Sequence, residues 1–416
     1  MRYAPPESLH GMLQRGRGRG AELALIDPAA PDLVYDCITC DYRWDWQVDE
    51  RYVYLARLVR DLHLPLAPIG ATLWKTDPNQ GSTFHNCAGV LEALGHAGVS
   101  EAVDEVRRYI HHGPHWLDLL ESVAIEWPRD WWDDLAEVAD RRLTPADRQN
   151  LWWRSEPWRS WADRHAWAAD LARPLPPRPP CADWPVEQLL DLVRDPHTPP
   201  ERKAPALFAL SRREPQPVLL DLAERLILAD PPHPVPGLRR ALKRLGPLAV
   251  AKARTWAQRP NHPLATTGLD ILAEHGDGRD LPLMVADIDG QWGTDWCGFN
   301  TAADGIARIA TRASPNERAA TYRVLPKLAK LWFITPHSYE RASYLRALLA
   351  LRPNADDPWL SEGLWDCEAD VRVLAANRAP LTENTRRRLH QLVTDPIEDD
   401  QVAETASARL SEPTEA

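Results

Sequence analysis

The chain has few cysteines, few phenylalanines and no long run of apolar residues. Only 4 of its 416 residues are Phe and only 6 are Cys, too few cysteines for a disulfide framework at this length. No run of about eighteen apolar residues occurs, which excludes an ordinary transmembrane helix. Residues 1–14 lack the apolar centre of a secretory signal. We therefore expect a cytoplasmic protein that makes no membrane contact.

Proline and tryptophan are abundant instead. The sequence contains 39 Pro and 19 Trp. Each Pro removes a backbone donor that a central strand would need. The segments between prolines are rich in Ala, Leu, Arg and Glu, which favour helices. We therefore predict an all-α protein whose short helices end at Pro or Gly.

The distribution of charge and proline predicts two halves. The net charge of −11 is uneven, because residues 1–175 carry 27 acidic and 19 basic side chains while residues 176–416 carry 33 and 30. Between them, the proline-rich run RPLPPRPPCADWP favours an extended spacer. We predict an acidic, Trp-rich helical half at 1–172, a linker at 173–185, a repeat array at 186–410 and a disordered tail at 411–416.

The second half repeats a helical phrase. Residues 206–213 (ALFALSRR), 269–277 (LDILAEHGD) and 346–354 (RALLALRPN) each carry an apolar stripe at helical spacing and stop near Gly or Pro. Such phrases recur roughly every 27 to 39 residues, the spacing of helical-hairpin repeats. Residues 89–110 of the first half follow the same pattern. We predict stacked helix pairs that each bury an apolar face against the next.

These phrases carry a resemblance to known repeats. The sequences LEALGHAGVSEAVDEV and LDILAEHGDGRDLPLMV resemble HEAT repeats of the phycobilisome-lyase type, and residues 370–395 (DVRVLAANRAPLTENTRRRLHQLVTD) are similar to the leucine-rich-variant repeat. The resemblance covers roughly residues 89–110 and 186–410. It implies a HEAT-like α-solenoid of stacked helical hairpins with a concave binding surface. It implies no catalytic residues.

An acidic and aromatic segment is the first candidate for a binding surface. Residues 27–50 hold seven acidic side chains and one Arg, with Trp44 and Asp45 among them. Carboxylates beside aromatic rings suit a basic or cationic partner through charge pairing and cation–π contact. The alternative is a solvated helix face whose aromatic rings turn inward.

Tryptophan pairs suggest a second surface. Ten Trp lie within residues 116–184, and the pairs 131–132 and 152–153 each point two rings about 100° apart on a helix. One ring of each pair then faces a partner or solvent, and we place Trp131 and Trp152 there. Packing between helices is the alternative for either ring.

A loop-like segment interrupts the repeats at residues 291–300 (QWGTDWCGFN). Segments that break a regular array are more often functional than decorative. We therefore predict a binding patch of Trp292, Asp295, Trp296, Cys297 and Asn300. A nucleophilic Cys297 is the less favoured alternative, since no His lies nearby in sequence to activate it.

The arginines of the RGRGRG run form a possible phosphate arm. Arg15, Arg17 and Arg19 alternate with glycine next to an expected helix start, an arrangement that can hold phosphate. Nearby acidic residues offer the alternative of simple ion pairing. Because the surrounding half is acidic, contact with nucleic acid is the less favoured reading.

Four residues have the chemistry of zinc ligands. Cys37 and Cys40 are spaced i, i+3, and His85 and Cys87 follow 45 residues later. The loops of a zinc knuckle are missing, so we expect buried, reduced cysteines and neither a metal nor another cofactor. Whether these four residues meet in space is not decided by the sequence.

The predicted function is non-catalytic binding of a protein or peptide on the concave face, as a scaffold or regulator. The alternatives are a HEAT-like enzyme acting on nucleic acid, as DNA glycosylases of this architecture do, and a small-molecule or peptide-modifying enzyme with a Trp-lined pocket. A net charge of −11 disfavours the first alternative.

Overall fold

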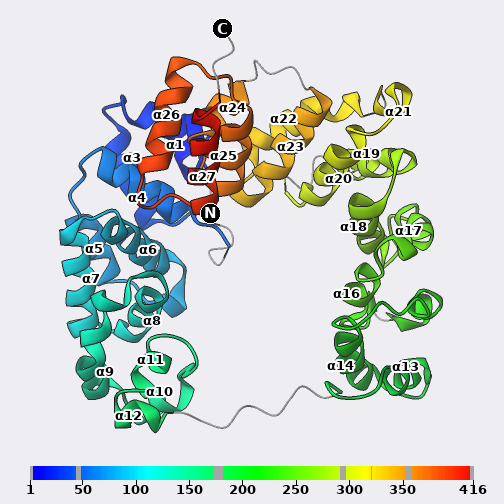
Figure 1. The fold of residues 1–416 in the computed structure, drawn as a ribbon, viewed down its shortest axis with the longest axis horizontal. Helices are drawn as coiled ribbons and strands as arrows, with labels where there is room; N and C mark the ends of the chain where they lie inside the picture. Colours follow the sequence, from blue (N-terminus) through cyan, green and yellow to red (C-terminus); the bar gives the residue numbers. More distant parts are fainter. Residues whose placement is uncertain are drawn as a thin grey trace. The chain divides into compact units, whose positions relative to one another are not determined.

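The computed structural model describes residues 3–43, 48–171, 181–229, 231–290, 297–319, 321–352 and 358–412. The prediction of an all-α protein is confirmed, since helices make up nearly all of the regular structure in these ranges (Figure 1). The exception is a short antiparallel pair, β1 (Ile227–Ala229) and β2 (Pro232–Pro234), in which Leu228 lies opposite His233. No helix in the described ranges is long and apolar enough to cross a membrane.

The chain forms two compact units that differ from the two predicted halves. The first contains Met1–Pro174, Phe333–Ala342 and Ala355–Ala416, and the second contains Leu175–Trp332 and Ser343–Asn354. The first boundary lies at the start of the predicted linker. The last part of the predicted repeat array, however, belongs to the same unit as the N-terminal segment.

The helices of the first unit come from both ends of the sequence. They are α1 (Leu9–Gln14), α2 (Gly18–Ala24), α3 (Ala30–Thr39), α4 (Arg51–Asp61), α5 (Ala67–Leu73), α6 (Thr83–His96), α7 (Ser100–His112), α8 (Trp116–Glu126), α9 (Ala136–Arg142), α10 (Pro145–Asn150), α11 (Trp158–Ala162) and α12 (Ala166–Ala169), and then α24 (Pro358–Gly363), α25 (Ala369–Arg378), α26 (Glu383–Thr394) and α27 (Asp400–Leu410). Short 3-10 turns are η1 (Pro78–Gln80), η2 (Arg129–Trp131), η3 (Asp133–Leu135) and η8 (Ser338–Glu340).

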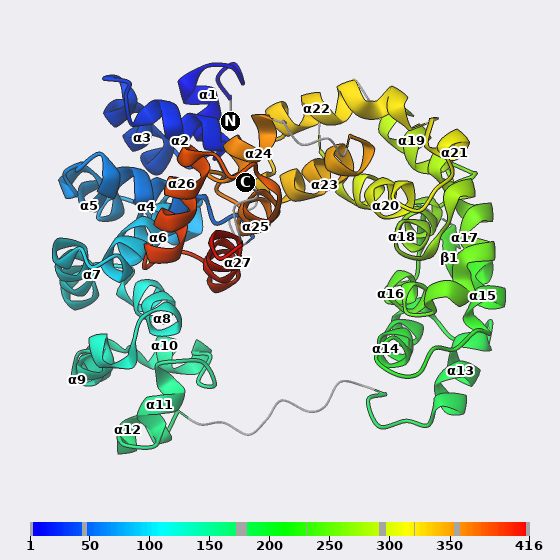
Figure 2. The same cartoon turned by 45° about the horizontal axis from the view of Figure 1, so that its top comes forward.

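Buried ion pairs join the two ends of the chain within this unit. Figures 1 and 2 both show α24–α27 beside α1–α4. Arg17 donates to both carboxylate oxygens of Glu362, and Arg57 pairs with Asp395 at 2.8 Å. Buried guanidinium groups need such partners, because an unpaired charge in the interior is strongly destabilising.

A glycine allows a close contact between the two ends of the chain. Gly16, at a positive φ of 67°, lies against Cys367, and a Cβ there would overlap its sulfur.

The second unit is a succession of helices, and those from α13 to α20 each pack against a near neighbour in the sequence (Figure 1). They are α13 (Val186–Arg194), α14 (Pro200–Leu210), α15 (Leu219–Leu222), η4 (Ala223–Leu226), α16 (Leu238–Lys243), η5 (Gly246–Ala249), α17 (Val250–Ala257), α18 (Ala265–His275), η6 (Gly278–Asp280), α19 (Leu281–Gly290), α20 (Asn300–Ala310), α21 (Pro315–Ala319), η7 (Tyr322–Val324), α22 (Leu325–Ile334) and α23 (Arg341–Leu351). The chain leaves this unit near the end of α22 and returns near the start of α23.

The segments that resemble known repeats each form two helices with a short turn between them. Residues 91–106 form the end of α6 and the first half of α7, residues 269–285 form most of α18 and the first half of α19, and residues 370–395 form α25 and α26. Gly268 allows α18 to lie close to α17, because a Cβ there would come within 2.7 Å of a backbone oxygen of α17. Apolar stripes and small residues at the contacts therefore set this sequential packing.

Candidate functional site

The strongest candidate site is a pocket of the first unit, between the start of α4 and the helices α6 and α8. Its volume is about 280 Å³, and its lining includes Glu50, Tyr52, Glu92, Asp118 and Glu126. We call these five residues the acidic pocket.

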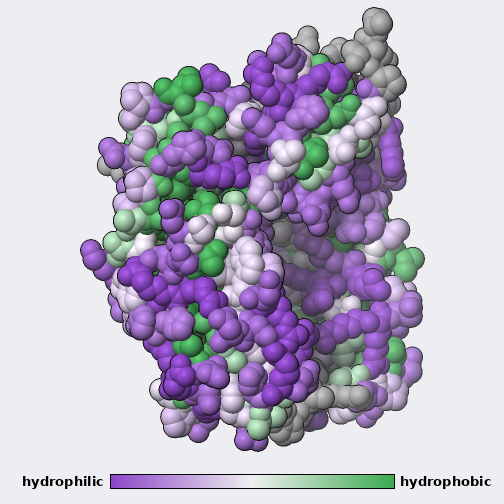
Figure 3. All heavy atoms as spheres, turned by 60° about the vertical axis from the view of Figure 1, so that its left-hand side comes forward, coloured by the Kyte–Doolittle hydropathy of each residue, from purple (hydrophilic) through white to green (hydrophobic). Residues whose placement is uncertain are grey.

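Hydrophilic side chains dominate the face of the molecule in Figure 3, and hydrophobic residues are exposed between them in narrow patches.

Glu92 is the distinctive residue of the acidic pocket. It lies on α6 and is 6% exposed. Its Oε2 accepts a hydrogen bond of 3.1 Å from the Ser122 hydroxyl of α8, whereas its Oε1 has no hydrogen-bond partner in the described part of the chain. Burial, with a smaller contribution from Glu126, raises the pKa of Glu92 to about 7. A buried carboxylate oxygen without a donor is unusual, because such a group loses hydration and gains nothing in return.

Tyr52 provides an aromatic surface next to these carboxyl groups. Its ring lies against α6 at Gly89, where a Cβ would come within 2.8 Å of the ring. Burial raises the pKa of the Tyr52 hydroxyl, and the carboxylates of Glu50, Glu126 and Glu92 raise it further. Three carboxyl groups therefore lie close enough to the Tyr52 ring to act on it electrostatically.

The arginine that lines the pocket does not cancel this charge. Arg43 donates to both carboxylate oxygens of Asp41 at 2.9 Å, so its charge is already matched. Asp49, which also lines the pocket, is paired with Arg51 at 2.6 Å. Among the residues that the structure describes, none of Glu50, Glu92, Asp118 or Glu126 forms an ion pair. The arrangement therefore favours a cation.

The sequence-predicted binding residues fall only partly within the described residues. Trp44, Asp45, Trp292, Asp295 and Trp296 lie outside the described residues. Cys297 and Asn300 are half-buried, and Asn300 is the first residue of α20. Both belong to the second unit.

The two predicted surface tryptophans differ from each other. Trp131 is half-buried and its ring packs edge-on against Trp127, with 5.5 Å between the ring centres. Its carbonyl accepts a hydrogen bond from Arg107. Trp152 is 76% exposed. The structure therefore leaves Trp152 available to a partner and uses Trp131 mainly in packing between helices.

The arginines of the predicted phosphate arm are mostly inside the first unit. Arg15 is buried and donates to the carbonyls of Ala4, Gly11 and Ile334. Arg17 is buried against Glu362, and Arg19 is exposed and pairs with Glu22 at 3.2 Å. Of the glycines in this run, Gly20 lies against α1, whereas Gly16 and Gly18 lie against Cys367 and the backbone of Glu362. The run is therefore packed and does not form a flexible arm.

The four residues with zinc-ligand chemistry, Cys37, Cys40, His85 and Cys87, do not form one group. Cys37 and Cys87 are buried, and Cys40 is exposed. Within the described ranges, the group of three potential metal ligands combines Cys37 with His10 and Asp36 and includes neither His85 nor Cys87. Sequence reasoning missed His10 because it lies 26 residues before Asp36.

Sequence reasoning also missed Glu92 and Tyr52. The acidic segment 27–50 contributes Glu50 to the acidic pocket, but Glu92 stands within the apolar phrase LEALG. The signal available in the sequence was an acidic residue among apolar neighbours in a segment expected to be helical. Its meaning depended on the partners that α4 and α8 supply.

No family model matches the chain, and no curated protein matches it. One solved structure is similar to it, the crystal structure of an engineered protein from the Northeast Structural Genomics Consortium. The two are 16% identical, the match covers 97% of this chain and 93% of the other, and the TM-score is 0.20.

Proposed function

We propose that the protein is a non-catalytic scaffold or regulator that binds a protein or peptide, and that the acidic pocket receives a basic side chain of this partner. The observation that carries the proposal is Glu92, a buried carboxyl group with one unpartnered oxygen at the pocket. A lysine or arginine side chain supplies both the missing donor and the missing positive charge.

The chemistry of the lining agrees with this ligand class. A cation above the Tyr52 ring gains cation–π attraction, and the carboxylates of Glu50, Glu92 and Glu126 attract it over a longer range. A pocket of about 280 Å³ accommodates a side chain and not a folded domain. The partner then binds by inserting one basic residue, as an anchor of an interface does.

We also propose that the helix pairs form a HEAT-like solenoid. The sequential packing of α17, α18, α19 and α20 in the second unit supports this reading, as does the packing of α6 with α7 and of α7 with α8 in the first. A solenoid presents side chains of successive repeats on one continuous surface. Such a surface suits an extended peptide that places a basic residue in the acidic pocket.

A labelled oligo-arginine peptide tests the proposal in the full-length protein. We expect saturable binding at about 150 mM salt, measured by fluorescence anisotropy. Glu92→Gln keeps the shape of the side chain and should weaken binding about tenfold or more. Glu137→Gln is the matched control, because it makes the same replacement at an exposed position of the same unit.

Two outcomes would contradict the proposal. Equal affinity of the Glu92→Gln and Glu137→Gln variants for the peptide would show that binding depends only on the overall negative charge of the protein. Tight binding of duplex DNA at the same salt concentration, with a steep salt dependence, would favour the nucleic-acid enzyme instead. The acidic pocket has no Trp in its lining, so the alternative of a Trp-lined active site finds no support there.

A further inference from the structure

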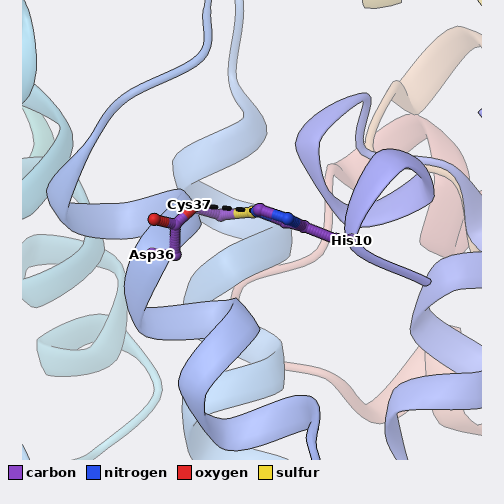
Figure 4. A group of neighbouring side chains, drawn as sticks. All are labelled: His10, Asp36 and Cys37. Carbon is purple, nitrogen blue, oxygen red and sulfur yellow. Dashed lines mark hydrogen bonds and ion pairs between the residues drawn. The ribbon is translucent and has the colours of Figure 1, made fainter. Parts of the chain in front are cut away.

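A second cluster of chemically active side chains lies on another part of the first unit. His10 of α1 points toward Asp36 and Cys37 of α3 (Figure 4). The imidazole nitrogen, carboxylate oxygen and sulfur that these residues offer all lie within 4.8 Å of one another. His10 and Asp36 are partly exposed, and Cys37 is buried. The cluster is thus reachable from solvent on one side and closed by protein on the other.

One ring nitrogen of His10 lies next to two groups with opposite hydrogen-bonding requirements. Its Nε2 lies 2.7 Å from Asp36 Oδ2 and 3.1 Å from Gln14 Nε2. The amide of Gln14 cannot turn round, because its Oε1 accepts a 2.7 Å hydrogen bond from the backbone N–H of Ala4. The same imidazole nitrogen therefore faces one group that only donates and one that only accepts at neutral pH.

Neither protonation state of His10 Nε2 satisfies both neighbours. If Nε2 carries a proton, it donates to Asp36 and meets the N–H groups of Gln14. If it carries none, it accepts from Gln14 and places its lone pair against a carboxylate. A cation bound between Nε2 and the carboxylate removes the repulsion between these two groups, because both then present lone pairs to positive charge. The Gln14 amide then loses Nε2 as an acceptor and must move away from the ring.

We propose that His10, Asp36 and Cys37 bind a zinc ion that ties α1 to α3, with Cys40 as the fourth ligand. Imidazole, carboxylate and thiolate together are the donor set of Zn²⁺, a borderline-soft ion. Cys40 follows Cys37 by three residues, directly after the end of α3, and its thiol donates a 3.4 Å hydrogen bond to Asp36 Oδ1. This inference departs from the sequence-based expectation of no metal, and it does not depend on the proposed peptide-binding function.

The geometry requires a small adjustment. Two ligand atoms about 2.0–2.3 Å from a tetrahedral zinc lie roughly 3.3–3.6 Å apart. The His10 and Asp36 atoms, now 2.7 Å apart, must therefore separate by about an ångström. The pairs that involve Cys37, now within 4.8 Å, must close by a similar amount, and the Cys40 side chain, whose sulfur is not part of this group, must turn toward it. On binding, the S–H bonds of Cys37 and Cys40 break, two Zn–S bonds form, and both protons leave to solvent.

Metal titration of the full chain tests this site. After treatment with a chelator, we expect the protein to take up one equivalent of Zn²⁺ in competition with a chromophoric indicator, and its melting temperature to rise. Co²⁺ in its place should give a thiolate-to-metal charge-transfer band in the near ultraviolet. His10→Asn, at a partly exposed position, and Cys37→Ser should each weaken zinc binding at least about tenfold. Cys87→Ser is the control, a buried cysteine of the same unit outside the group.

The outcomes separate a metal site from a hydrogen-bonded cluster. Failure to bind one equivalent of Zn²⁺ at micromolar concentration would overturn the proposal. Equal zinc affinity of His10→Asn and the wild-type chain would do the same, provided that the metal-free variant has an unchanged circular dichroism spectrum. A Co²⁺ complex without the charge-transfer band would exclude Cys37 and Cys40 as ligands.

Discussion

At the scale of single residues, Glu92 links a candidate binding site to the pH dependence of stability. Its pKa is about 7 in the folded chain and has the ordinary value of 4.5 when unfolded. Between these values the folded chain holds a proton that the unfolded chain releases. The contribution of Glu92 to the free energy of unfolding therefore falls as pH rises through this window, by on the order of 3 kcal/mol.

Glu92→Gln should remove this part of the pH dependence. We expect the variant to be more stable than the wild type by on the order of 2 kcal/mol near pH 8 and nearly equal to it near pH 5. Urea unfolding at the two pH values measures the difference. Part of the slope should remain, because burial also raises the pKa of Glu368 to about 7. Lower stability of the variant at both pH values would contradict this, because it would show that Glu92 Oε1 accepts a stabilising hydrogen bond in the folded chain.

Arg341 and Asp366 form a fully buried ion pair of the first unit. Both side chains are 0% exposed, and Arg341 also donates to the carbonyls of Arg15 and Gly16. Arg341→Met leaves Asp366 charged and unpaired in the interior, so we expect a loss of about 3–5 kcal/mol in the free energy of unfolding.

Arg387→Met is the matched control for Arg341→Met. Arg387 pairs with Glu383 on the surface of α26, where a single ion pair contributes less than about 0.5 kcal/mol. Denaturant unfolding of the two variants compares the positions directly. Similar losses would mean that the buried pair contributes no more than a surface pair.

At the scale of elements, the tryptophans of α10–α12 divide into packing and exposed rings. Trp161 is fully buried on α11 and packs edge-on against Trp132 and Trp158. Its indole N–H donates to Asp133 at 3.3 Å. Trp152 lies between α10 and α11 and is mostly exposed.

Alanine substitution should separate these two roles. We expect Trp161→Ala to lower the free energy of unfolding by about 3–5 kcal/mol, because it empties a large volume of the core. Trp152→Ala should change it by less than about 0.5 kcal/mol. Thermal melts of both variants measure the contrast. A large loss for Trp152→Ala would indicate that its ring packs against protein in solution.

At the scale of the whole molecule, the first unit depends on both ends of the chain. Arg57 and Arg60 of α4 both pair with Asp395, and Arg57 also pairs with Glu398. A chain that ends at residue 352 loses these partners together with Glu362. We expect the first unit of this truncated chain not to fold cooperatively, because several buried arginines are then left unpaired.

Differential scanning calorimetry and near-ultraviolet circular dichroism test this truncation. Most of the Trp residues lie in the first unit, so its loss should remove most of the near-ultraviolet signal. A truncated chain that retains this signal and a cooperative transition would show that residues 3–171 fold without the C-terminal helices.

The sequence determined the local structure of this protein. Apolar stripes at helical spacing, ended by Gly or Pro, predicted helices, and α6, α7, α18, α19, α25 and α26 form at those stripes. The scarcity of strand formers excluded a large sheet, and the structure has only the short β1–β2 pair in the described residues. These features follow from neighbours along the chain, which a sequence displays directly.

The tertiary structure decided which distant residues meet. In the sequence Arg17 resembles part of a phosphate arm, but in the structure it pairs with Glu362, 345 residues away. Tyr52 and Ser122 reach Glu92 from other helices, and His10 reaches Asp36 and Cys37 from α1. The role of a charged or metal-ligating side chain depends on burial and on its partners in space. Neither is encoded in local periodicity, so the candidate sites became visible only once the helices were packed.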